Sequence, residues 1–398
     1  MARSPPDHVQ EHTSVTTECR AGFLERLSDT AGGTILGFIA FSLSFYLLFT
    51  NEGRAVQTAA SLDEGLSIVT SLSHVHTMDF EHENRLVHLS APLYTSKPLY
   101  DPNYGVSVHC VKLKRQVEMF QWVEYEESRE YEENGETNTQ SRYSYNTEWK
   151  SEVVSSRHFD REIAHQNPSA MAVESFTAVA SDVRLGTFSL GSGLIDQINN
   201  FKQMPPVQGG APNADITTQG DFFYQSVNPK NPEVGDLRIS FWYAGASLGG
   251  TSSGPVDTVS VIARVKGGVL GPYRTASGDV LELLYPGKLT AEDVFRAEHQ
   301  TNTVKTWGLR GAGWLMMFLG ISLMTKIFHT LVDWIPGLRD LVSLGLKIFA
   351  LCVSTSLSLL TIALGWFFYR PVLSLLLAAL GVGVIVLAKS RVPQKKYQ

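Results

Sequence analysis

The chain has 398 residues, of which 43% are apolar, and its formal net charge is −6. The charge is uneven: residues 51–306 carry 21 Lys/Arg and 32 Asp/Glu, whereas the segments on either side carry 12 and 7. An acidic central domain excludes nucleic acid as its expected ligand, and because Cys110 is its one cysteine, the domain cannot contain an internal disulfide.

Residues 1–30 are expected to form a cytosolic or nucleoplasmic tail. Cys19 lies about a dozen residues before an apolar run, a position typical of palmitoylation, and a free cytosolic thiol explains it equally well. Residues 31–50 (AGGTILGFIAFSLSFYLLFT) carry no charge over a length that crosses a bilayer as a helix. The tail is too long and too mixed for a cleavable signal peptide, so this run is expected to be the first transmembrane helix.

Residues 51–306 are expected to form a large β-rich domain flanked by helices. Residues 51–72 have loose helical spacing, and the period of the apolar positions changes to two from about Arg85. Two β-prone runs, residues 105–131 and 141–154, lie on either side of Asn134-Gly135. An Asn-Gly pair between such runs predicts a long hairpin.

The second half of this domain predicts a second hairpin. It is expected to join residues 259–265 to residues 269–275 about Gly267-Gly268, with further strands at 236–244 and 279–285. Residues 205–212 and 245–255 are expected to be loops. Thr290 and Asp293 have the spacing of a capping box, which predicts a helix that continues towards the second apolar segment.

The C-terminal quarter contains three more expected transmembrane helices, at residues 307–330, 345–369 and 371–388. Arg370 alone separates the last two, which predicts a tight helical hairpin with an aromatic belt at residues 366–369. The connection at residues 331–344 is expected to be amphipathic. Lys326, His329 and Asp333 share one helical face opposite Leu331, Trp334, Ile335 and Leu338, which favours a helix in the cytosolic interface over a conduction path.

The basic tail at residues 389–398 indicates the orientation. Lys389, Arg391, Lys395 and Lys396 place this tail in the cytosol by the positive-inside rule, so four spans place both termini there and residues 51–306 in the lumen. Lys395 and Lys396 are the fourth and third residues from the end. This is the dilysine retrieval pattern of endoplasmic-reticulum membrane proteins.

The third expected span carries small residues on two nearly opposite faces. One stripe is Ser354, Ser358, Thr361 and Gly365, and the other is Cys352, Ser356 and Ala363. Small residues allow close helix packing, so the span is expected to lie between two neighbours within the chain or in another subunit. The alternative is that the hydroxyls bond carbonyls of their own helix.

Motifs that resemble catalytic or metal sites have simpler explanations. Residues 250–254 match the G-x-S-x-G pattern of serine hydrolases, but no helix follows, so a solvated loop is expected. Four histidines are spaced too irregularly for zinc and are expected to be surface residues: His74, His76, His82 and His88. An acidic run lacks the glycine-containing ligand loop of a calcium site and is expected at a hairpin tip: Glu124, Glu126, Glu127, Glu130, Glu132, Glu133 and Glu136. No catalytic residue, cofactor site or metal site is predicted, and the protein is not expected to be an enzyme.

The chain resembles the LUMA (transmembrane protein 43) family almost from end to end. The residues that carry the resemblance include GFLERLSDTAGG (22–33), SFYLLFTNEGRA (44–55), DPNYGV (101–106), RYSYNTEW (142–149), NPSAMAVESF (167–176), PEVGDLR (232–238), KTWGLR (305–310), DWIPGLRDLV (333–342), GWFFYRP (365–371) and RVPQKK (391–396). The resemblance implies an α+β membrane protein with four transmembrane helices and a large β-rich lumenal domain.

The same resemblance implies a function. It points to a multi-pass scaffold of the endoplasmic reticulum and inner nuclear membrane that forms homo-oligomers, contacts membrane lipid, binds emerin and lamins, and organises nuclear-envelope complexes. The alternative is an ion-pathway or lipid-handling membrane protein.

Overall fold

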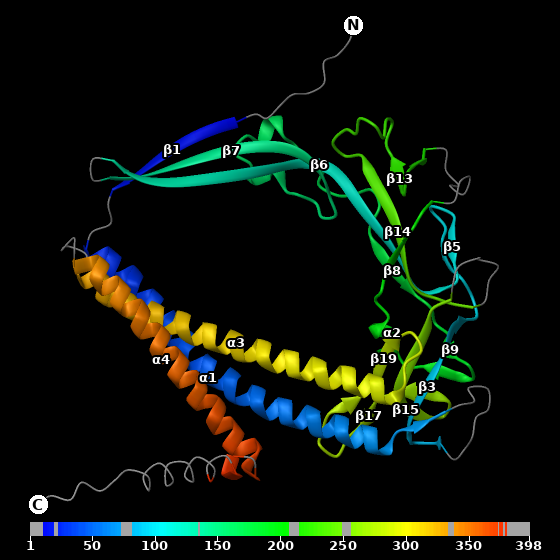
Figure 1. Ribbon diagram of the computed structural model, residues 1–398. Helices are drawn as coiled ribbons and strands as arrows, with labels where there is room; N and C mark the ends of the chain where they lie inside the picture. Colours follow the sequence, from blue (N-terminus) through cyan, green and yellow to red (C-terminus); the bar gives the residue numbers. More distant parts are fainter. Residues whose placement is uncertain are drawn as a thin grey trace, which may run out of the picture. The chain divides into compact units, whose positions relative to one another are not determined.

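A computed structural model describes residues 11–19, 23–72, 82–133, 136–206, 215–248, 256–332, 338–372, 374–376 and 379. These residues divide into two compact units. The β domain comprises the described residues of 1–20, 69–273 and 282–291, and the helical unit comprises those of 21–68, 274–281 and 292–398. The expected α+β class is therefore confirmed, and the two units are drawn together in Figure 1.

Three long helices form the helical unit. They are α1 (Phe23–Ile68), α3 (Ala291–Val332) and α4 (Leu338–Tyr369). α1 and α3 run without interruption for 46 and 42 residues, so the helices expected at residues 51–72 and from Thr290 are continuous with the first and second expected spans. α1 ends at Ile68, a few residues before the expected end at residue 72, and the chain then enters a short strand of the β domain.

Two helices among the described residues are long and apolar enough to cross a membrane. They are Gly32–Ile68 within α1 and Leu344–Tyr369 within α4. The expected second span, residues 307–330, lies inside α3. This part of α3 is less apolar than the spans in α1 and α4 because Lys305, Arg310 and Lys326 lie within it or beside it. The expected fourth span, residues 371–388, lies mostly outside the described residues, as do residues 333–337 of the connection. α4 begins at Leu338, inside the expected connection.

The β domain contains two large sheets. Among the described residues, sheet A has eight strands in the order β1-β7-β6-β14-β13-β12, with β11 on β14 and β8 on β6. Its strands are β1 (Glu11–Cys19), β6 (Cys110–Glu133), β7 (Glu136–Lys150), β8 (Phe176–Val179), β11 (Lys202–Met204), β12 (Thr217–Gln219), β13 (Phe222–Gln225) and β14 (Leu237–Ala246). β6, β7 and β14 form its long central part (Figure 1).

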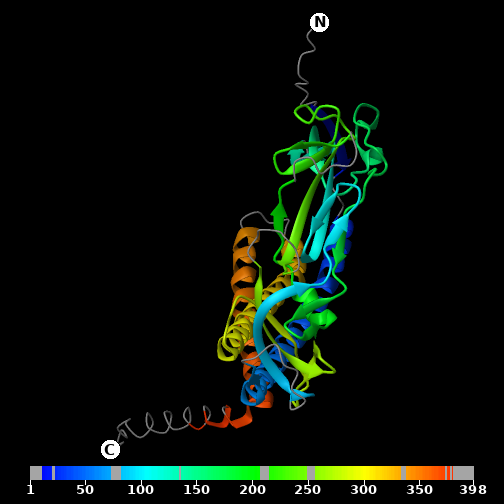
Figure 2. The ribbon, with the colours of Figure 1, turned by 90° about the vertical axis from the view of Figure 1, so that its right-hand side faces the viewer.

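Sheet B closes on itself. Its order is β19-β15-β16-β10-β9-β3-β2, and β3 also pairs with β15, so five strands form a ring. Its strands are β2 (Thr70–Ser71), β3 (Leu86–Thr95), β9 (Val183–Leu185), β10 (Phe188–Leu190), β15 (Thr258–Lys266), β16 (Val269–Gly271) and β19 (Leu283–Pro286). Figure 2 shows the bend of β3, in light blue, that this closure requires. A short helix, α2 (Ser192–Gln197), follows β10.

Two further pairs of short strands complete the described elements. β4 (Leu99–Asp101) pairs with β5 (Val106–Val108), and β17 (Tyr273–Arg274) pairs with β18 (Val280–Leu281).

The two expected hairpins are confirmed by the strand pairing. β6 and β7 pair antiparallel in a register that places Glu133 opposite Glu136, and β15 and β16 pair with Lys266 opposite Val269. Their ends differ from the prediction: β7 stops at Lys150, and the run expected at residues 269–275 is divided between β16 and β17. Residues 134–135, at the first turn, lie outside the described residues.

Part of the expected N-terminal tail forms a strand. Residues 11–19 form β1, which pairs antiparallel with β7 and places Cys19 opposite Glu136. The centre of this strand is rich in Thr and Val, residues that favour β structure.

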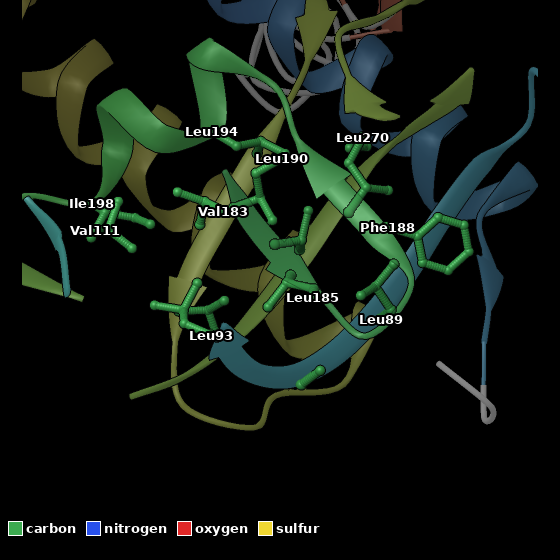
Figure 3. Close-up of a cluster of buried hydrophobic side chains, with 14 of the residues drawn as sticks. Leu89, Leu93, Val111, Val183, Leu185, Phe188, Leu190, Leu194, Ile198 and Leu270 are labelled. Atoms are coloured by element: carbon green, nitrogen blue, oxygen red, sulfur yellow. The ribbon is translucent and has the colours of Figure 1, made fainter. Parts of the chain in front are cut away.

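Each sheet has its own apolar core. Inside the ring of sheet B, Leu89, Leu93, Leu185 and Phe188 are almost completely buried (Figure 3). The second core lies on sheet A and includes Tyr104, Leu113, Phe223 and Phe241. Burial of each such side chain stabilises the fold by about 1.5–3 kcal/mol before other costs, so core packing replaces the missing disulfide.

Candidate functional site: a buried polar cluster between three helices

α1 and α3 pack closely because glycines meet at their contact. A Cβ atom placed on Gly37 would lie 2.8 Å from the carbonyl oxygen of Gly320, and one on Gly320 would lie 2.8 Å from the backbone nitrogen of Phe41. Gly37 and Gly320 therefore permit a backbone approach that a larger residue would prevent. Leu48, Met317, Ile321 and Ala350 fill the apolar layer that joins these helices to α4.

Polar side chains of α1, α3 and α4 meet just beyond this apolar layer. Asn302, Thr306 and Arg310 are spaced by four residues and therefore share one face of α3. On α1, Asn51 and Glu52 follow directly after the uncharged run that ends at Thr50. These residues, with Arg54 of α1 and Trp366 of α4, form what we call the polar cluster.

A buried ion pair lies at the centre of the polar cluster. Arg310 donates two hydrogen bonds to Glu52, from Nε to Oε1 at 2.6 Å and from Nη2 to Oε2 at 2.8 Å. Trp366 donates from Nε1 to Oε2 of Glu52 at 2.9 Å. The side chains of Glu52 and Arg310 are 1% and 12% exposed. The two-point geometry satisfies both carboxylate oxygens, which a buried carboxylate requires.

Arg54 links α1 to α3 through neutral acceptors. It donates to Oδ1 of Asn302 at 3.1 Å, to Oδ1 of Asn51 at 3.0 Å and to Oγ1 of Thr306 at 3.1 Å. The amide of Asn51 donates to the carbonyl of Thr306, and that of Asn302 donates to the carbonyl of Ala55. The Nε of Arg54 is buried without a partner among the described residues. The polar cluster therefore has more donors than acceptors.

A groove opens beside the polar cluster and has a volume of about 290 Å³. Its polar lining comes from α3, from α4 and from the residue that follows α4: His299, Asn302, Thr306, Arg310, Trp366 and Arg370. The Arg310 and Arg370 guanidinium groups lie 5.8 and 5.9 Å from the centre of the Trp366 ring, and Arg310 also lies 4.7 Å from the Trp307 ring. The groove combines cations and indole rings, a lining suited to an anionic ligand.

The small residues of α4 are divided between two environments. Ser354, Ser358 and Thr361 are buried, and a Cβ atom on Gly365 would lie 2.9 Å from Cγ of Glu52. Ser354 and Thr361 hydrogen-bond to carbonyls of their own helix, as the alternative interpretation required, whereas Ser358 donates to the sulfur of Met317 at 3.5 Å. The other stripe, Cys352, Ser356 and Ala363, is exposed.

The remaining residues singled out from the sequence do not gather into a site. Lys395, Lys396 and the motif at residues 250–254 lie outside the described residues, as do His74 and His76. Cys19 lies in β1. Among the described residues, no three His, Cys, Asp or Glu side chains are placed to hold a metal ion.

The expectation that the four histidines lie at the surface is wrong for His88. Its side chain is buried in sheet B because it lies on a strand that is covered on both faces. Nε2 bonds to the carbonyl of Leu289 at 3.0 Å, and Nδ1 lies 3.2 Å from the hydroxyl of Ser71. Since a carbonyl only accepts, Nε2 carries the proton and Nδ1 accepts from Ser71. Burial lowers the pKa of His88 below 6.5.

The pairing of Arg310 with Glu52 and Trp366 was not predicted from the sequence. The available signal was a Glu two residues after an uncharged run of twenty, matched by an Arg directly before the next apolar run. Two opposite charges at equivalent ends of antiparallel spans are expected to meet. Trp366 gave no comparable signal, because an aromatic belt explains it equally well.

Comparison with known proteins identifies the family. The family model described as Transmembrane protein 43 matches residues 119–371, which include most strands of both sheets, α3 and α4 but not β1, β2 or β3. The chain belongs to the transmembrane protein 43 family. It is 57% identical to Transmembrane protein 43 of Homo sapiens and of Mus musculus over 389 residues, which are 98% of this chain and 97% of each relative.

A more distant member of the transmembrane protein 43 family also covers most of the chain. The Transmembrane protein 43 homolog of Drosophila melanogaster is 33% identical over 365 residues, 88% of this chain and 93% of the relative. No solved structure matches the chain significantly. The protein is therefore a membrane protein with membrane-spanning helices.

Proposed function

We propose that this protein is a non-enzymatic scaffold of the endoplasmic-reticulum and inner nuclear membranes that self-associates and organises nuclear-envelope protein complexes. The observation that carries the proposal is the division of small residues on α4. One stripe is used within the chain, against α1 and α3, whereas Cys352, Ser356 and Ala363 remain exposed. A helix face of small residues allows a second helix to approach closely, so this face suits the α4 of another copy.

The sequence supports the location and the partners. The basic tail and the dilysine at Lys395 and Lys396 favour cytosolic termini and retention in the endoplasmic reticulum. Emerin and lamins are proposed as partners because the resemblance to the family implies them. If residues 51–306 are lumenal, contacts with nucleoplasmic proteins fall on residues 1–30, 328–343 and 389–398, which are the segments left on the other side of the bilayer.

Cross-linking through Cys352 tests self-association directly. In a Cys19→Ser variant, Cys352 is exposed on α4, whereas Cys110 is buried and its pKa is raised to about 12, so Cys110 does not react at neutral pH. A short bismaleimide added to the protein in mild detergent is expected to join two chains. Ser356→Leu, one turn from Cys352, is expected to lower the yield of this dimer and the native mass.

Ser354→Leu is the matched substitution on the opposite face. Ser354 is completely buried, so the added bulk is expected to destabilise the single chain by about 1–3 kcal/mol, whereas Ser356→Leu leaves the thermal stability of the monomer almost unchanged. Equal cross-linking and equal native mass for wild type and Ser356→Leu would place Ser356 against lipid and remove the support for self-association through α4. Lipid handling is the second candidate function, and the groove beside the polar cluster favours it.

A further inference from the structure

In the described part of the chain, no Asp or Glu lines the groove beside the polar cluster, whereas Arg310 and Arg370 do. Glu52 faces the Arg310 guanidinium and the Trp366 indole, and both of its oxygens are already bonded to these two residues. Arg54 and Arg370 have no carboxylate within salt-bridge distance among the described residues. Asp63 lies 3.1 Å from His299, one of the lining residues, and still leaves three guanidinium groups, those of Arg54, Arg310 and Arg370, against two carboxylates.

Unused donors remain in the same place. The hydrogen bonds of Arg310 use Nε and Nη2, which leaves Nη1 without a hydrogen-bond partner among the described residues. In the described part of the chain, the Arg370 guanidinium makes no hydrogen bond or ion pair and lies 5.9 Å from the centre of the Trp366 ring. A guanidinium group presents paired N–H donors that match two oxygens of a phosphate. The guanidinium groups of Arg310 and Arg370, which both lie near the Trp366 ring, therefore offer the donors that an anion site needs.

The surroundings of the groove indicate where the anion comes from. The uncharged run of α1 ends at Thr50, next to Asn51 and Glu52, so the groove lies at the level where a bilayer's hydrocarbon gives way to headgroups. Large aromatic side chains beside it are exposed: Trp307 is 65% exposed and Phe368 is 67% exposed. Exposed aromatic side chains at this level contact acyl chains and glycerol groups.

We propose that the groove binds the phosphate group of a phospholipid from the leaflet at which the uncharged run of α1 ends. Arg370 and Nη1 of Arg310 bind the phosphate oxygens, and the groove, at about 290 Å³, holds the headgroup while the acyl chains lie along the exposed aromatic surface. This site is independent of the proposed self-association, because Cys352 and Ser356 do not line it.

The test measures lipid affinity of the full chain in detergent. Phosphatidic acid is titrated into the micelles, and the thermal midpoint and the binding isotherm are recorded for wild type, Arg370→Gln and Arg370→Lys. Phosphatidic acid is expected to stabilise the wild type. Arg370→Gln is expected to weaken its binding about tenfold, the effect of losing one charge-assisted hydrogen-bonding group. Arg370→Lys is expected to retain part of the affinity, because it keeps the charge without the paired donors.

Lys305→Gln provides the matched control. Lys305 is exposed on α3 within two turns of Arg310 but does not line the groove, so its loss removes the same charge near the same level of the membrane. Its affinity is expected to equal that of wild type, and an equal loss in both variants would reduce the effect to general electrostatic attraction and overturn the site.

Two further probes distinguish the source of the phosphate. Diacylglycerol, which lacks the phosphate, and inorganic phosphate, which lacks the acyl chains, are each expected to leave the thermal midpoint unchanged. Stabilisation by diacylglycerol equal to that by phosphatidic acid would mean acyl packing alone and would overturn the proposal. Equal stabilisation by inorganic phosphate would assign the groove to a soluble ion and overturn its assignment to lipid. No effect of phosphatidic acid on the wild type would overturn it entirely.

Discussion

Glu52 and Arg310 are nearly excluded from solvent, so each depends on the other to compensate its charge. Arg310→Gln would leave the Glu52 carboxylate buried without a counter-ion, and we expect it to lower the stability of the helical unit by about 3–5 kcal/mol. The measurement is thermal or denaturant unfolding in mild detergent. The double variant Glu52→Gln with Arg310→Gln is expected to lose less than the sum of the single changes, because neither buried charge then remains unpaired.

Arg296→Gln is the control for this prediction. Arg296 also lies on α3 and also pairs with a carboxylate, Asp293, but its side chain is 68% exposed. Surface substitutions of this kind change stability by about 0.5 kcal/mol or less. If Arg310→Gln were as harmless as Arg296→Gln, the Glu52–Arg310 pair would have no role in holding the three helices together.

His88 makes the stability of the β domain depend on pH. Burial lowers the pKa of His88 below its ordinary 6.5, and the bond to the Leu289 carbonyl opposes the shift without cancelling it. Below pH 6.5 the unfolded chain binds a proton that the folded domain does not, so stability falls as the pH drops from 6.5 through the lower folded-state pKa. Above pH 6.5 this contribution is fully present.

The comparison of wild type with His88→Gln isolates this effect. Gln keeps a donor and an acceptor on a side chain of similar reach but does not titrate. Thermal midpoints measured on both sides of pH 6.5 are expected to show a smaller acid-induced loss for His88→Gln than for wild type. Parallel curves for the two proteins would mean that His88 titrates equally in the folded and unfolded states.

At the scale of single elements, the β1–β7 pairing and a membrane-spanning α1 require different positions of residues 11–19. β1 pairs with β7, whereas one crossing of the membrane by α1 would put residues 11–19 on the side opposite β7. A chain whose α1 spans a bilayer cannot keep the β1–β7 pairing. In sealed microsomes, we therefore expect Cys19 to react with a membrane-impermeant maleimide and a Glu136→Cys variant to form no disulfide with Cys19.

The same variant tests the pairing when no membrane separates the strands. Cys19 and residue 136 lie directly opposite in the β1–β7 register, so oxidation of Glu136→Cys in detergent is expected to join them. A Ser144→Cys variant, opposite Glu11 at the other end of β1, is the control and should not cross-link to Cys19. Formation of the disulfide by Glu136→Cys in sealed microsomes would place residues 11–19 on the side of the β domain and overturn the topology with cytosolic termini.

Local patterns predicted those elements whose partners are close in sequence. Asn134-Gly135 located the β6–β7 hairpin, and Gly267-Gly268 located the β15–β16 hairpin, because a turn brings adjacent strands together without other information. The closure of sheet B was not predictable in this way. It depends on the pairing of β3 with β15, about 170 residues later, and no local pattern specifies such a partner.

Only part of the polar cluster was predictable, because its residues come from segments that are far apart in sequence. Arg310 stands out as a charge beside an apolar run, but its pairing with Glu52 joins residues far apart in sequence, and Trp366 comes from a third helix. The long helices α1 and α3 were predicted from local signals, since residues 51–72 and the run from Thr290 were expected to be helical beside the two spans. Their apolar runs end near Thr50 and begin near Gly311, while the helices continue with polar sequence that packs between them.

At the scale of the whole molecule, the proposed topology places residues 51–306 in the lumen. The natural sequence has no Asn-x-Ser/Thr acceptor in this region, apart from an Asn-Pro-Ser that proline disqualifies, so Gly250→Asn introduces one, with Thr251 and Ser252 following. We expect this variant to be glycosylated in microsomes, with a mass shift that an endoglycosidase removes. Gly250→Gln is the matched control without an acceptor, and a folded but unmodified Gly250→Asn protein would contradict the lumenal assignment.

The unbroken length of α1 has a mechanical consequence. Its 46 residues span about 70 Å, whereas the hydrocarbon core of a bilayer is about 30 Å thick. Residues 51–68 therefore project as a rigid arm of roughly 27 Å beyond the uncharged run. A change of about 20° in the tilt of the span, which lies within the range of roughly 0–40° that membrane helices show, would move the Ile68 end of this arm sideways by about 9 Å. Thinning or thickening of the membrane is thereby converted into a lateral displacement at the point where the chain leaves α1.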